Sequence, residues 1–477
     1  MIDRQLFQSQ IQRRLEENPR AWLKYGILAA VLVASVGLAF IDNQRLLLLP
    51  PVAIAGVALL VLFLREPSLG LLAMVIASLV IPSPFSSSRT GNINPGMMIE
   101  ILLVGLWLLD MIARRRHISL APSRTNLPLF LFMIWSVIAL INGQINYYFT
   151  TQLASPIAQI SGLAIFILSG VAYLLVGNLT SGLVWLKRLT WLFIILSAFY
   201  IFGRLIPPVK PYIFRVYQYG SDGSIFWIWL VAMISSQLLL NRQLSQRVRL
   251  ALGAVLAGTL YIALIEAYSW KSGWLPAMLA VAVIVFIGLP RFRTLSVFVA
   301  IFVGILGSSK IASLVSSGED YSISTRTVAW NLVLQIVKAN PILGLGPANY
   351  YWYTPLFPIL GYAVNYNSHN NYIDILAQMG IIGLALFLWF AWEVGFLGWK
   401  LKDVVPDGFE RAYVIGVLGG LAGTLVTGML GDWFFPFVYN VGLHGYRSSI
   451  LAWLFLGGLV FLEQVYLRQG KGEPADH

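Results

Sequence analysis

Cysteine is absent from this chain, and charged side chains are scarce. With no cysteine among 477 residues, disulfides, thiolate nucleophiles and cysteine metal ligands are excluded. Charged residues make up 11% of the chain and hydrophobic residues 58%, whereas soluble domains carry roughly 25% charged residues. Apolar runs long enough to cross a bilayer recur between Lys24 and Leu467. The sequence therefore predicts an all-α protein, a polytopic transmembrane helical bundle.

We expect about fourteen transmembrane helices, with twelve as the lower limit. Their expected ranges are 24–41, 46–64, 68–82, 97–113, 127–143, 157–177, 184–203, 223–240, 250–266, 274–289, 294–307, 374–398, 411–431 and 449–467. No cleavable signal peptide precedes the first, so we expect that helix to be retained. The expected parts are a cytoplasmic segment (1–23), a first part of the bundle (24–307), a large outer loop (308–373), a C-terminal part of the bundle (374–467) and a cytoplasmic tail (468–477).

The formal net charge of +12 is distributed unevenly between the two sides of the predicted bundle. With the N-terminus inside, 22 of the 32 basic residues lie on the inner side. This bias orients the protein with both termini in the cytoplasm, so the charge predicts no nucleic-acid partner. The longer polar loops, and with them the expected site of chemistry, face outward.

One histidine stands out among the four of the chain. His369 opens an apolar segment directly after the large outer loop. Ser368 is the expected N-cap of that helix, and a helix N-terminus disfavours an added positive charge. A largely neutral imidazole suits a general base, although an interfacial histidine bonded to backbone is the alternative. Asn370 either orients the ring or binds a hydroxyl, and His444 is the second candidate.

The outer loop is expected to contain amphipathic helical structure, with a helix at residues 325–338 that lies against the bilayer surface. Arg326 falls in its first turn, where a cation opposes the helix dipole, and on its apolar stripe. It either reaches a lipid phosphate or contacts a substrate phosphate. The aromatic residues between Tyr350 and Tyr366 suit an interfacial belt, sugar stacking, or both.

Three further basic residues lie on the outer side. Lys271, in a short connection between two spans, is either functional or an interface anchor. Arg215 either binds substrate, as does the nearby Tyr217, or pairs with Asp222. Arg204 ends a helix and either caps it or binds substrate.

The outer side carries no Asp-x-Asp pair and no His/Asp cluster with metal-ligand spacing. We therefore expect no metal and no cofactor, with basic side chains stabilising developing charge instead. Paired carboxylates of the glycosidase type are also not evident, which disfavours a double-displacement hydrolase.

Residues 326–383 resemble the O-antigen ligase and O-antigen polymerase superfamily. The resemblance is carried by Arg326, by the segment 340–346, by Ser368-His369-Asn370, and by Gly380-x-x-Gly383. Two weaker matches are residues 215–222, similar to an arginine-containing outer loop of the family, and residues 269–274, similar to its Ser-Arg-Gly segment. Lys271 stands where the family usually has arginine, which keeps the charge but loses bidentate geometry.

The resemblance implies a GT-C-like glycosyltransferase of the bacterial inner membrane with its active site on the periplasmic side. Such enzymes transfer a glycan from an undecaprenyl-diphosphate carrier to an acceptor hydroxyl. The acceptor is lipid A–core for a ligase or a second lipid-linked glycan for a polymerase, and a chain-length regulator is an expected partner beside membrane lipids. His369, Arg326 and Arg215 are then the catalytic residues, and the substrate-binding residues are Lys271, Asn370, Ser368, Arg204 and Tyr217.

Two other functions compete with transfer. A lipid-linked oligosaccharide flippase would also suit a large helical bundle, and it should show inverted repeats or interrupted helices with charges near the bilayer midplane. A scaffold without catalysis is the third alternative.

Overall fold

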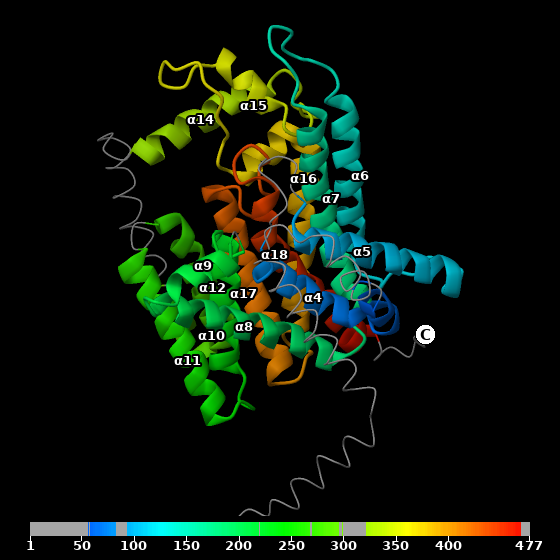
Figure 1. Ribbon diagram of the computed structural model, residues 1–477, viewed down its shortest axis with the longest axis vertical. Coiled ribbons are helices and arrows are strands. Elements are labelled where there is room, and N and C mark those ends of the chain that lie inside the picture. Colours follow the sequence, from blue (N-terminus) through cyan, green and yellow to red (C-terminus); the bar gives the residue numbers. More distant parts are fainter. Residues whose placement is uncertain are drawn as a thin grey trace, which may run out of the picture. The chain divides into compact units, whose positions relative to one another are not determined.

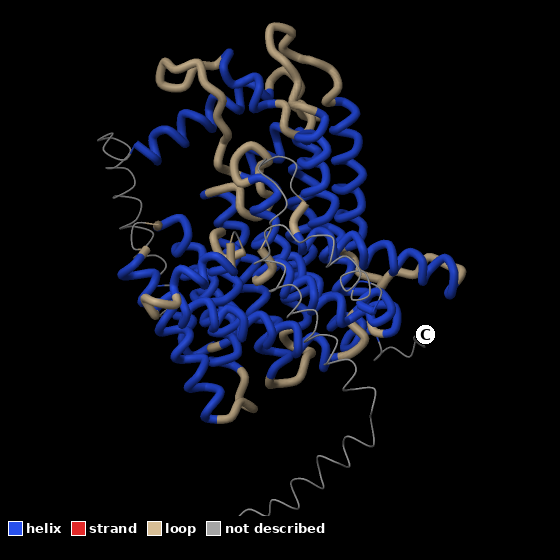
Figure 2. Tube along the Cα trace, in the orientation of Figure 1, coloured by secondary structure: helices blue, strands red, loops and turns tan. Residues whose placement is uncertain are grey.

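A computed structural model describes residue 56 and residues 58–82, 93–218, 220–267, 270–294, 298 and 321–468. Among these residues the protein is built from helices and loops, with no strand (Figure 2). The chain divides into two units, residues 1–70 and 71–477. In the first, residues 58–65 are helical, and the helix α4, Pro67–Leu79, continues into the second.

The second unit contains the remaining helices (Figure 1). The α-helices are α5 Pro95–Leu109, α6 Asn126–Asn142, α7 Pro156–Leu179, α8 Leu183–Leu205, α9 Lys210–Val216, α10 Ser224–Leu240, α11 Gln246–Tyr261, α12 Lys271–Gly288, α14 Tyr321–Val337, α15 Tyr350–Tyr353, α16 Asn371–Leu401, α17 Phe409–Leu430 and α18 Gly442–Glu463. Short π- and 3-10 segments are η1 Asp110–Arg115, η2 Ile262–Glu266, η3 Pro290–Phe292, η4 Thr354–Leu356 and η5 Gln464–Arg468.

Several helices begin at residues suited to that position. Asn94 precedes α5 and accepts a hydrogen bond from a backbone N–H of the first turn, and Ser155 does the same for α7. Proline follows each cap, at Pro95 and Pro156, where its missing N–H costs nothing. These starts agree with the predicted ranges to within two residues.

Seven helices of the described part are long and apolar enough to cross a membrane. They are Pro95–Ala113, Pro156–Leu179, Leu183–Leu205, Gln246–Glu266, Asn371–Leu401, Phe409–Leu430 and Gly442–Arg468. Four shorter apolar helices join them, at Pro67–Leu79, Asn126–Asn142, Ser224–Leu240 and Ser272–Gly288. The all-α, membrane-embedded class is confirmed. The predicted total of fourteen stays a prediction, since the range 24–41 and most of the ranges 46–64 and 294–307 lie outside the described residues.

Close helix packing around α17 fixes the position of α12. A Cβ on Gly419 would lie 2.6 Å from the backbone oxygen of Ala280, and one on Gly423 would lie 2.7 Å from that of Pro276. Small residues allow this approach in membrane proteins. The residue number in contact rises from 419 to 423 along α17 while it falls from 280 to 276 along α12. The two helices therefore run antiparallel. The N-terminus of α12 therefore lies beside the C-terminal end of α17.

The start of α18 differs from its prediction. The range 449–467 was expected, with residues 432–448 as a polar outer segment, but the helix begins at Gly442. The first turns of α18 carry polar side chains that are buried against other helices. The Tyr446 hydroxyl donates to Glu100 (2.8 Å), and Arg447 Nε donates to the Ser78 carbonyl (2.8 Å). His444, the second candidate for a base, is buried in this helix rather than placed on a loop.

Candidate active site

A break in α16 organises the site. Gly380 has φ +68° and ψ −173°, so α16 is two helical segments joined at this residue. A strap formed by residues 341–347 fills the break. The N–H of Leu345 donates to the Ala377 carbonyl (2.8 Å), and that of Gly346 donates to the Gln378 carbonyl (3.0 Å). The strap therefore takes the place of the missing helical turn.

The remaining backbone groups at the break are also bonded. The N–H of Ile381 donates to the Pro341 carbonyl (2.9 Å), and the indole of Trp135 donates to the Met379 carbonyl (2.8 Å). Unbonded backbone groups at membrane depth cost several kcal/mol each, so a broken helix needs such partners. The two parts of the sequence resemblance, residues 340–346 and Gly380-x-x-Gly383, thus interlock.

Only glycine fits at the centre of this contact. A Cβ on Gly380 would lie 2.0 Å from the Ile342 backbone oxygen, and one on Gly344 (φ +77°) would lie 2.5 Å from the N of Gly380. Both the backbone angles and the space therefore require glycine. The close approach of the two backbones explains why the sequence has glycine at both Gly344 and Gly380.

The turn before α16 presents His369. Asn370 is the N-cap: its side chain accepts from the N–H groups of Tyr372 (3.0 Å) and Ile373 (3.3 Å). The prediction that Ser368 caps the helix is wrong by two residues. His369 has φ +49°, a left-handed conformation uncommon for residues other than glycine. Such conformations persist where surrounding contacts enforce them.

Buried groups support this turn from below. The Ser368 hydroxyl lies 2.8 Å from Asp374 Oδ1, to which Tyr350 also donates, and the Trp330 indole donates to the Ser368 carbonyl (2.7 Å). Burial, followed by the charge of Asp374, raises the pKa of Tyr350 well above its ordinary value, so this hydroxyl stays protonated as a donor. Ser368 is fully buried and Asn370 nearly so. Both residues hold the turn in place, and their predicted contact with substrate stays a prediction.

His369 faces a buried carboxylate. Its Nδ1 lies 3.6 Å from Asp432 Oδ1, and the imidazole side chain is 41% exposed while that of Asp432 is 2% exposed. Asp432 Oδ2 accepts from the Phe437 N–H (3.2 Å), and the Asn440 amide donates to Asp432 Oδ1 (2.8 Å) and lies 3.3 Å from His369 Nδ1. Asp432 and Asn440 both contact Nδ1 of His369, so Nε2 is the ring nitrogen free of these contacts.

Asn371 fixes the segment that carries Asp432. Its side-chain oxygen accepts from the N–H groups of Phe434 (3.1 Å) and Phe435 (3.2 Å), and its amide donates to the Phe435 carbonyl (2.7 Å). Asp432 is visible in the sequence as an outer acid, but its role was missed. The partner of an acid on a separate loop cannot be read from local spacing.

Arg326 approaches the same place from α14. Its Nη1 donates to the carbonyl of Leu430 (3.0 Å), the last residue of α17 and two positions before Asp432. The Trp330 bond to the turn before α16 holds the next turn of α14 over the site. Arg326 is therefore bonded to the chain segment that also carries Asp432, the partner of His369.

The backbone of Lys271 arrives there too. It begins α12, whose N-terminus lies beside the C-terminal end of α17, although the side chain of Lys271 lies outside the described part. The role of Lys271 therefore stays a prediction.

The other two predicted cations lie elsewhere. Arg204 binds Glu266 (2.9 Å) and the Tyr200 hydroxyl (3.1 Å), and Glu266 also pairs with Lys210 (3.3 Å). Arg204 thus belongs to an ion pair at the end of α8, and its predicted role in substrate binding stays a prediction.

Arg215 is exposed on α9, and no contact within the described part of the chain joins it to His369. Tyr217 is buried and donates to the Leu196 carbonyl (2.7 Å), and burial raises its pKa above the ordinary value. Tyr217 is therefore a packing residue, and Arg215 stays a prediction.

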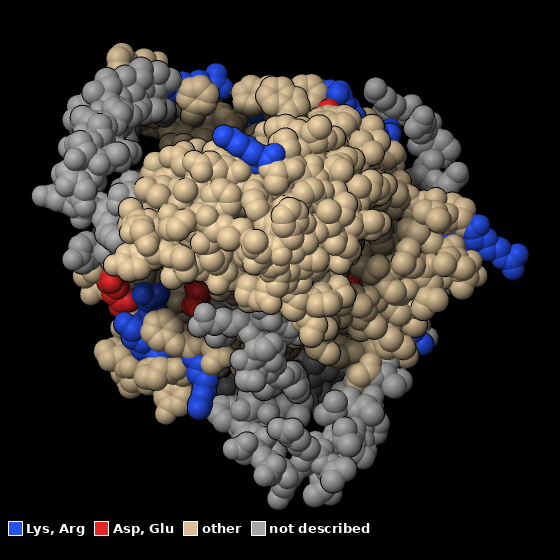
Figure 3. All heavy atoms as spheres, turned by 90° about the horizontal axis from the view of Figure 1, so that it is seen from above, with Lys and Arg blue, Asp and Glu red and all other residues tan. Residues whose placement is uncertain are grey.

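The aromatic residues of the outer loop divide into two sets. Tyr350 and Tyr353 are fully buried. Tyr351 stacks on Tyr439 with 4.5 Å between ring centroids, and the Trp352 indole donates to the Tyr439 hydroxyl (2.8 Å). The face of the molecule seen from above in Figure 3 is largely uncharged. Tyr351, Trp352 and Tyr439 are partly exposed, and Tyr362 of the same loop is exposed. They are the rings available to contact a sugar.

The arrangement is suited to proton transfer beside an anion. A half-exposed imidazole with a buried carboxylate at one nitrogen can accept a proton at the other. A guanidinium bonded to the carbonyl of Leu430, two residues before that carboxylate, can meet negative charge as it develops.

Residues 244–388 match the family model described as O-Antigen ligase. No curated protein matches the chain. The matched segment contains Lys271, Arg326, His369 and the break at Gly380, and together with the apolar helices it supports a membrane enzyme of surface polysaccharide synthesis. The match confirms, through residues 244–388, the resemblance of this chain to the O-antigen ligase and polymerase superfamily.

Proposed function

We propose that this protein transfers a glycan from an undecaprenyl-diphosphate carrier to an acceptor hydroxyl, on the outer side of a bacterial inner membrane. The observation that carries the proposal is the pairing of exposed His369 with buried Asp432, two residues after the Leu430 carbonyl to which Arg326 donates. Such a pairing supplies a base and a cation to a single substrate position. A GT-C-like fold accompanies the proposal, as the family resemblance implies.

His369 acts as the general base. In the proposed state Nδ1 carries the proton and faces Asp432 Oδ1 (3.6 Å), and the Asn440 amide donates to Asp432 alone. Nε2 then takes the proton of the attacking hydroxyl. Such a base contributes typically ~10²–10⁴-fold in rate. The hydroxyl oxygen bonds to the anomeric carbon as the bond to the carrier diphosphate breaks, and this single displacement inverts the anomeric centre.

Basic side chains stabilise the leaving diphosphate. Arg326 is the first of them, because its guanidinium already lies at the C-terminal end of α17, and Lys271 on the neighbouring α12 is the second. Donors aimed at developing charge contribute a few kcal/mol each, and ~1.36 kcal/mol is tenfold in rate. Arg215 is the third cation that we propose for this role.

The interrupted helix does not favour transport over transfer. In transporters the freed backbone groups of a broken helix coordinate substrate or ions. Here, among the described residues, those of α16 bond to the strap and to Trp135. The break therefore serves to position His369.

A defined donor distinguishes the two kinds of acceptor. The purified enzyme is supplied with an undecaprenyl-diphosphate oligosaccharide alone, and in a second reaction with lipid A–core. A ladder of products from the donor alone identifies a polymerase, and a product that needs lipid A–core identifies a ligase. If neither reaction consumes the donor, the transfer proposal is wrong.

Arg326→Ala should reduce transfer by about 10²–10³-fold. Arg326→Lys should lose less, because lysine keeps the charge without the two-pronged geometry. Initial rates are measured over a range of donor concentrations, with Arg247→Ala as the control because Arg247 is exposed at the start of α11. Equal losses in Arg326→Ala and Arg326→Lys would show that the charge of Arg326 does not act on the diphosphate.

Asp432→Asn should lower kcat by about 10–100-fold with little change in donor KM, since Asp432 acts through His369. If Asp432 acts only by positioning His369, replacing Asp432 has no further effect on kcat once His369 is absent. The double variant His369→Ala/Asp432→Asn should therefore be no slower than His369→Ala. A further loss in the double variant would assign Asp432 an independent role.

A further inference from the structure

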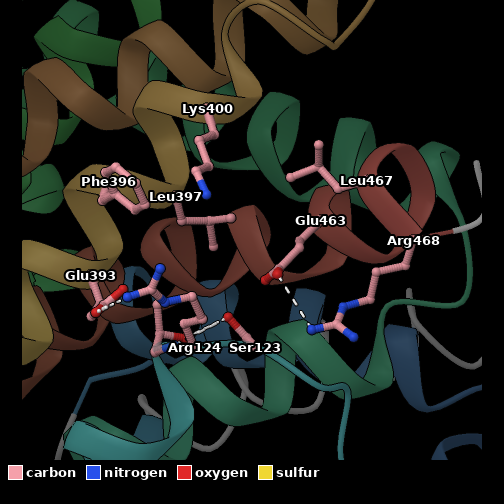
Figure 4. A pocket seen from close by; sticks show the side chains of 10 residues that line it. Ser123, Arg124, Glu393, Phe396, Leu397, Lys400, Glu463, Leu467 and Arg468 are labelled. Carbon is pink, nitrogen blue, oxygen red and sulfur yellow. Dashed lines mark hydrogen bonds and ion pairs between the residues drawn. The ribbon is translucent and has the colours of Figure 1, made fainter. Parts of the chain in front are cut away.

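A second charged cavity lies at the other end of α16. It has a volume of about 410 Å³ and lies between the chain before α6, the C-terminal end of α16, and the junction of α18 with η5 (Figure 4). Its charged residues are Arg124, Glu393, Lys400, Glu463 and Arg468. With a rise of ~1.5 Å per helical residue, Lys400 is roughly 40 Å along α16 from His369. The cavity is thus separate from the candidate active site.

The cavity has one cation more than it has carboxylates. Arg124 pairs with Glu393 (3.0 Å), and Arg468 Nη2 lies 3.7 Å from Glu463 Oε1. No carboxylate of the described residues lies within ion-pair distance of Lys400, which rests over the Phe396 ring at 4.4 Å and points into the cavity (Figure 4). The surplus charge of Lys400 favours a ligand with one negative charge.

Two buried polar atoms of the cavity also have no partner among the described residues. Glu463 Oε2 accepts no hydrogen bond, and Arg468 Nε donates none. Buried polar atoms are nearly always bonded, so each such exception needs an explanation. A ligand that satisfies both must offer a hydrogen-bond donor to Glu463 and an acceptor to Arg468.

The surroundings identify the source of this ligand as the membrane. Leu397, Leu467 and Phe396 give the cavity an apolar wall. Trp392 and Trp399 are exposed on the same end of α16, and tryptophan is enriched where helices leave the bilayer. A headgroup can therefore enter the cavity while its acyl chains stay in the lipid.

We propose that this cavity binds the headgroup of an anionic phosphodiester lipid that also carries hydroxyl groups, the class of phosphatidylglycerol. The phosphate lies between Lys400 and Arg468 Nε, and a headgroup hydroxyl donates to Glu463 Oε2. The single negative charge of the phosphodiester balances the surplus charge of Lys400. This site does not depend on the transfer reaction.

The test titrates the full-length chain in detergent with four probes: phosphatidylglycerol, phosphatidylethanolamine, phosphatidic acid and free glycerol 1-phosphate. Bound ligand is counted by native mass spectrometry. Phosphatidylglycerol should bind at least about tenfold more tightly than phosphatidylethanolamine or glycerol 1-phosphate. Equal binding of phosphatidylethanolamine overturns the charge argument, and equal binding of glycerol 1-phosphate overturns the lipid as its source.

Variants place the ligand in the cavity. Lys400→Gln should weaken phosphatidylglycerol binding at least about tenfold, and Glu463→Gln should remove the preference for phosphatidylglycerol over phosphatidic acid. The matched control is Lys402→Gln, because Lys402 lies two residues away, pairs with Asp403 and does not line the cavity. Unchanged binding in Lys400→Gln, or an equal loss in Lys402→Gln, would overturn the proposal.

Discussion

His369→Ala should abolish glycan transfer, with a loss of about 10²–10⁴-fold, while the protein stays folded and binds the donor lipid. The loss is expected because Nε2 of His369 is the ring nitrogen left free of the contacts to Asp432 and Asn440. Transfer is measured with a defined undecaprenyl-diphosphate oligosaccharide, and donor binding is measured separately.

A companion variant separates chemistry from backbone strain. His369 has φ +49°, and asparagine adopts this conformation more readily than alanine. His369→Asn should therefore fold as well as wild type and still lose transfer to the same extent. His117→Ala changes a histidine that is exposed and far along the chain, and it should behave as wild type. Transfer at the wild-type rate by either His369 variant would eliminate the base assignment.

Gly380→Ala should destabilise the protein by about 3–5 kcal/mol. The φ and ψ of Gly380 belong to a region that only glycine occupies easily, and the added Cβ would lie 2.0 Å from the Ile342 oxygen. The strap would separate from α16, and the carbonyls of Ala377 and Gln378 would lose their donors. Thermal unfolding followed by size-exclusion chromatography measures the change.

The same helix offers the control. Gly395 lies in the C-terminal segment of α16, and a Cβ there would meet only Leu421 Cδ2, at 3.6 Å. Gly395→Ala should be neutral or stabilise the protein by up to ~1 kcal/mol, the usual preference for alanine in a helix. If both variants lose stability equally, the contact between the strap and Gly380 is not the cause.

The long apolar runs could be predicted from the sequence because their length and hydropathy alone suit a membrane-spanning helix, whichever helices lie beside them. The predicted ranges 157–177 and 374–398 differ from α7 and α16 by three residues or fewer at each end. The predicted start of α18 was seven residues late because Tyr446 and Arg447 resemble loop residues. The buried partner of Tyr446, Glu100, lies 346 positions away, and that of Arg447, the Ser78 carbonyl, lies 369 positions away. No local pattern can bridge such distances.

Part of the candidate site could also be predicted from the sequence. His369 and Arg326 could be identified because a lone histidine and a cation on an apolar stripe are unusual. Asp432 and Asn440 could not, since they meet His369 only after the loop between α17 and α18 folds against α16. Ser368 and Tyr217 were assigned to substrate from their position in the chain, whereas their burial gives them structural roles.

The two ends of α14 are held to the protein with unequal strength. Its C-terminal half buries Val333, Ile336 and Val337 in an apolar cluster, worth about 5–9 kcal/mol together. Its N-terminal half is held by the side-chain hydrogen bonds of Arg326 and Trp330, which contribute about 0.5–3 kcal/mol each. Thermal motion therefore releases the N-terminal half first, and α14 pivots about its other end. If the proposed transfer is correct, this side of α14 is the exit for a long saccharide product, and the turn that carries His369 loses the Trp330 bond each time that half is released.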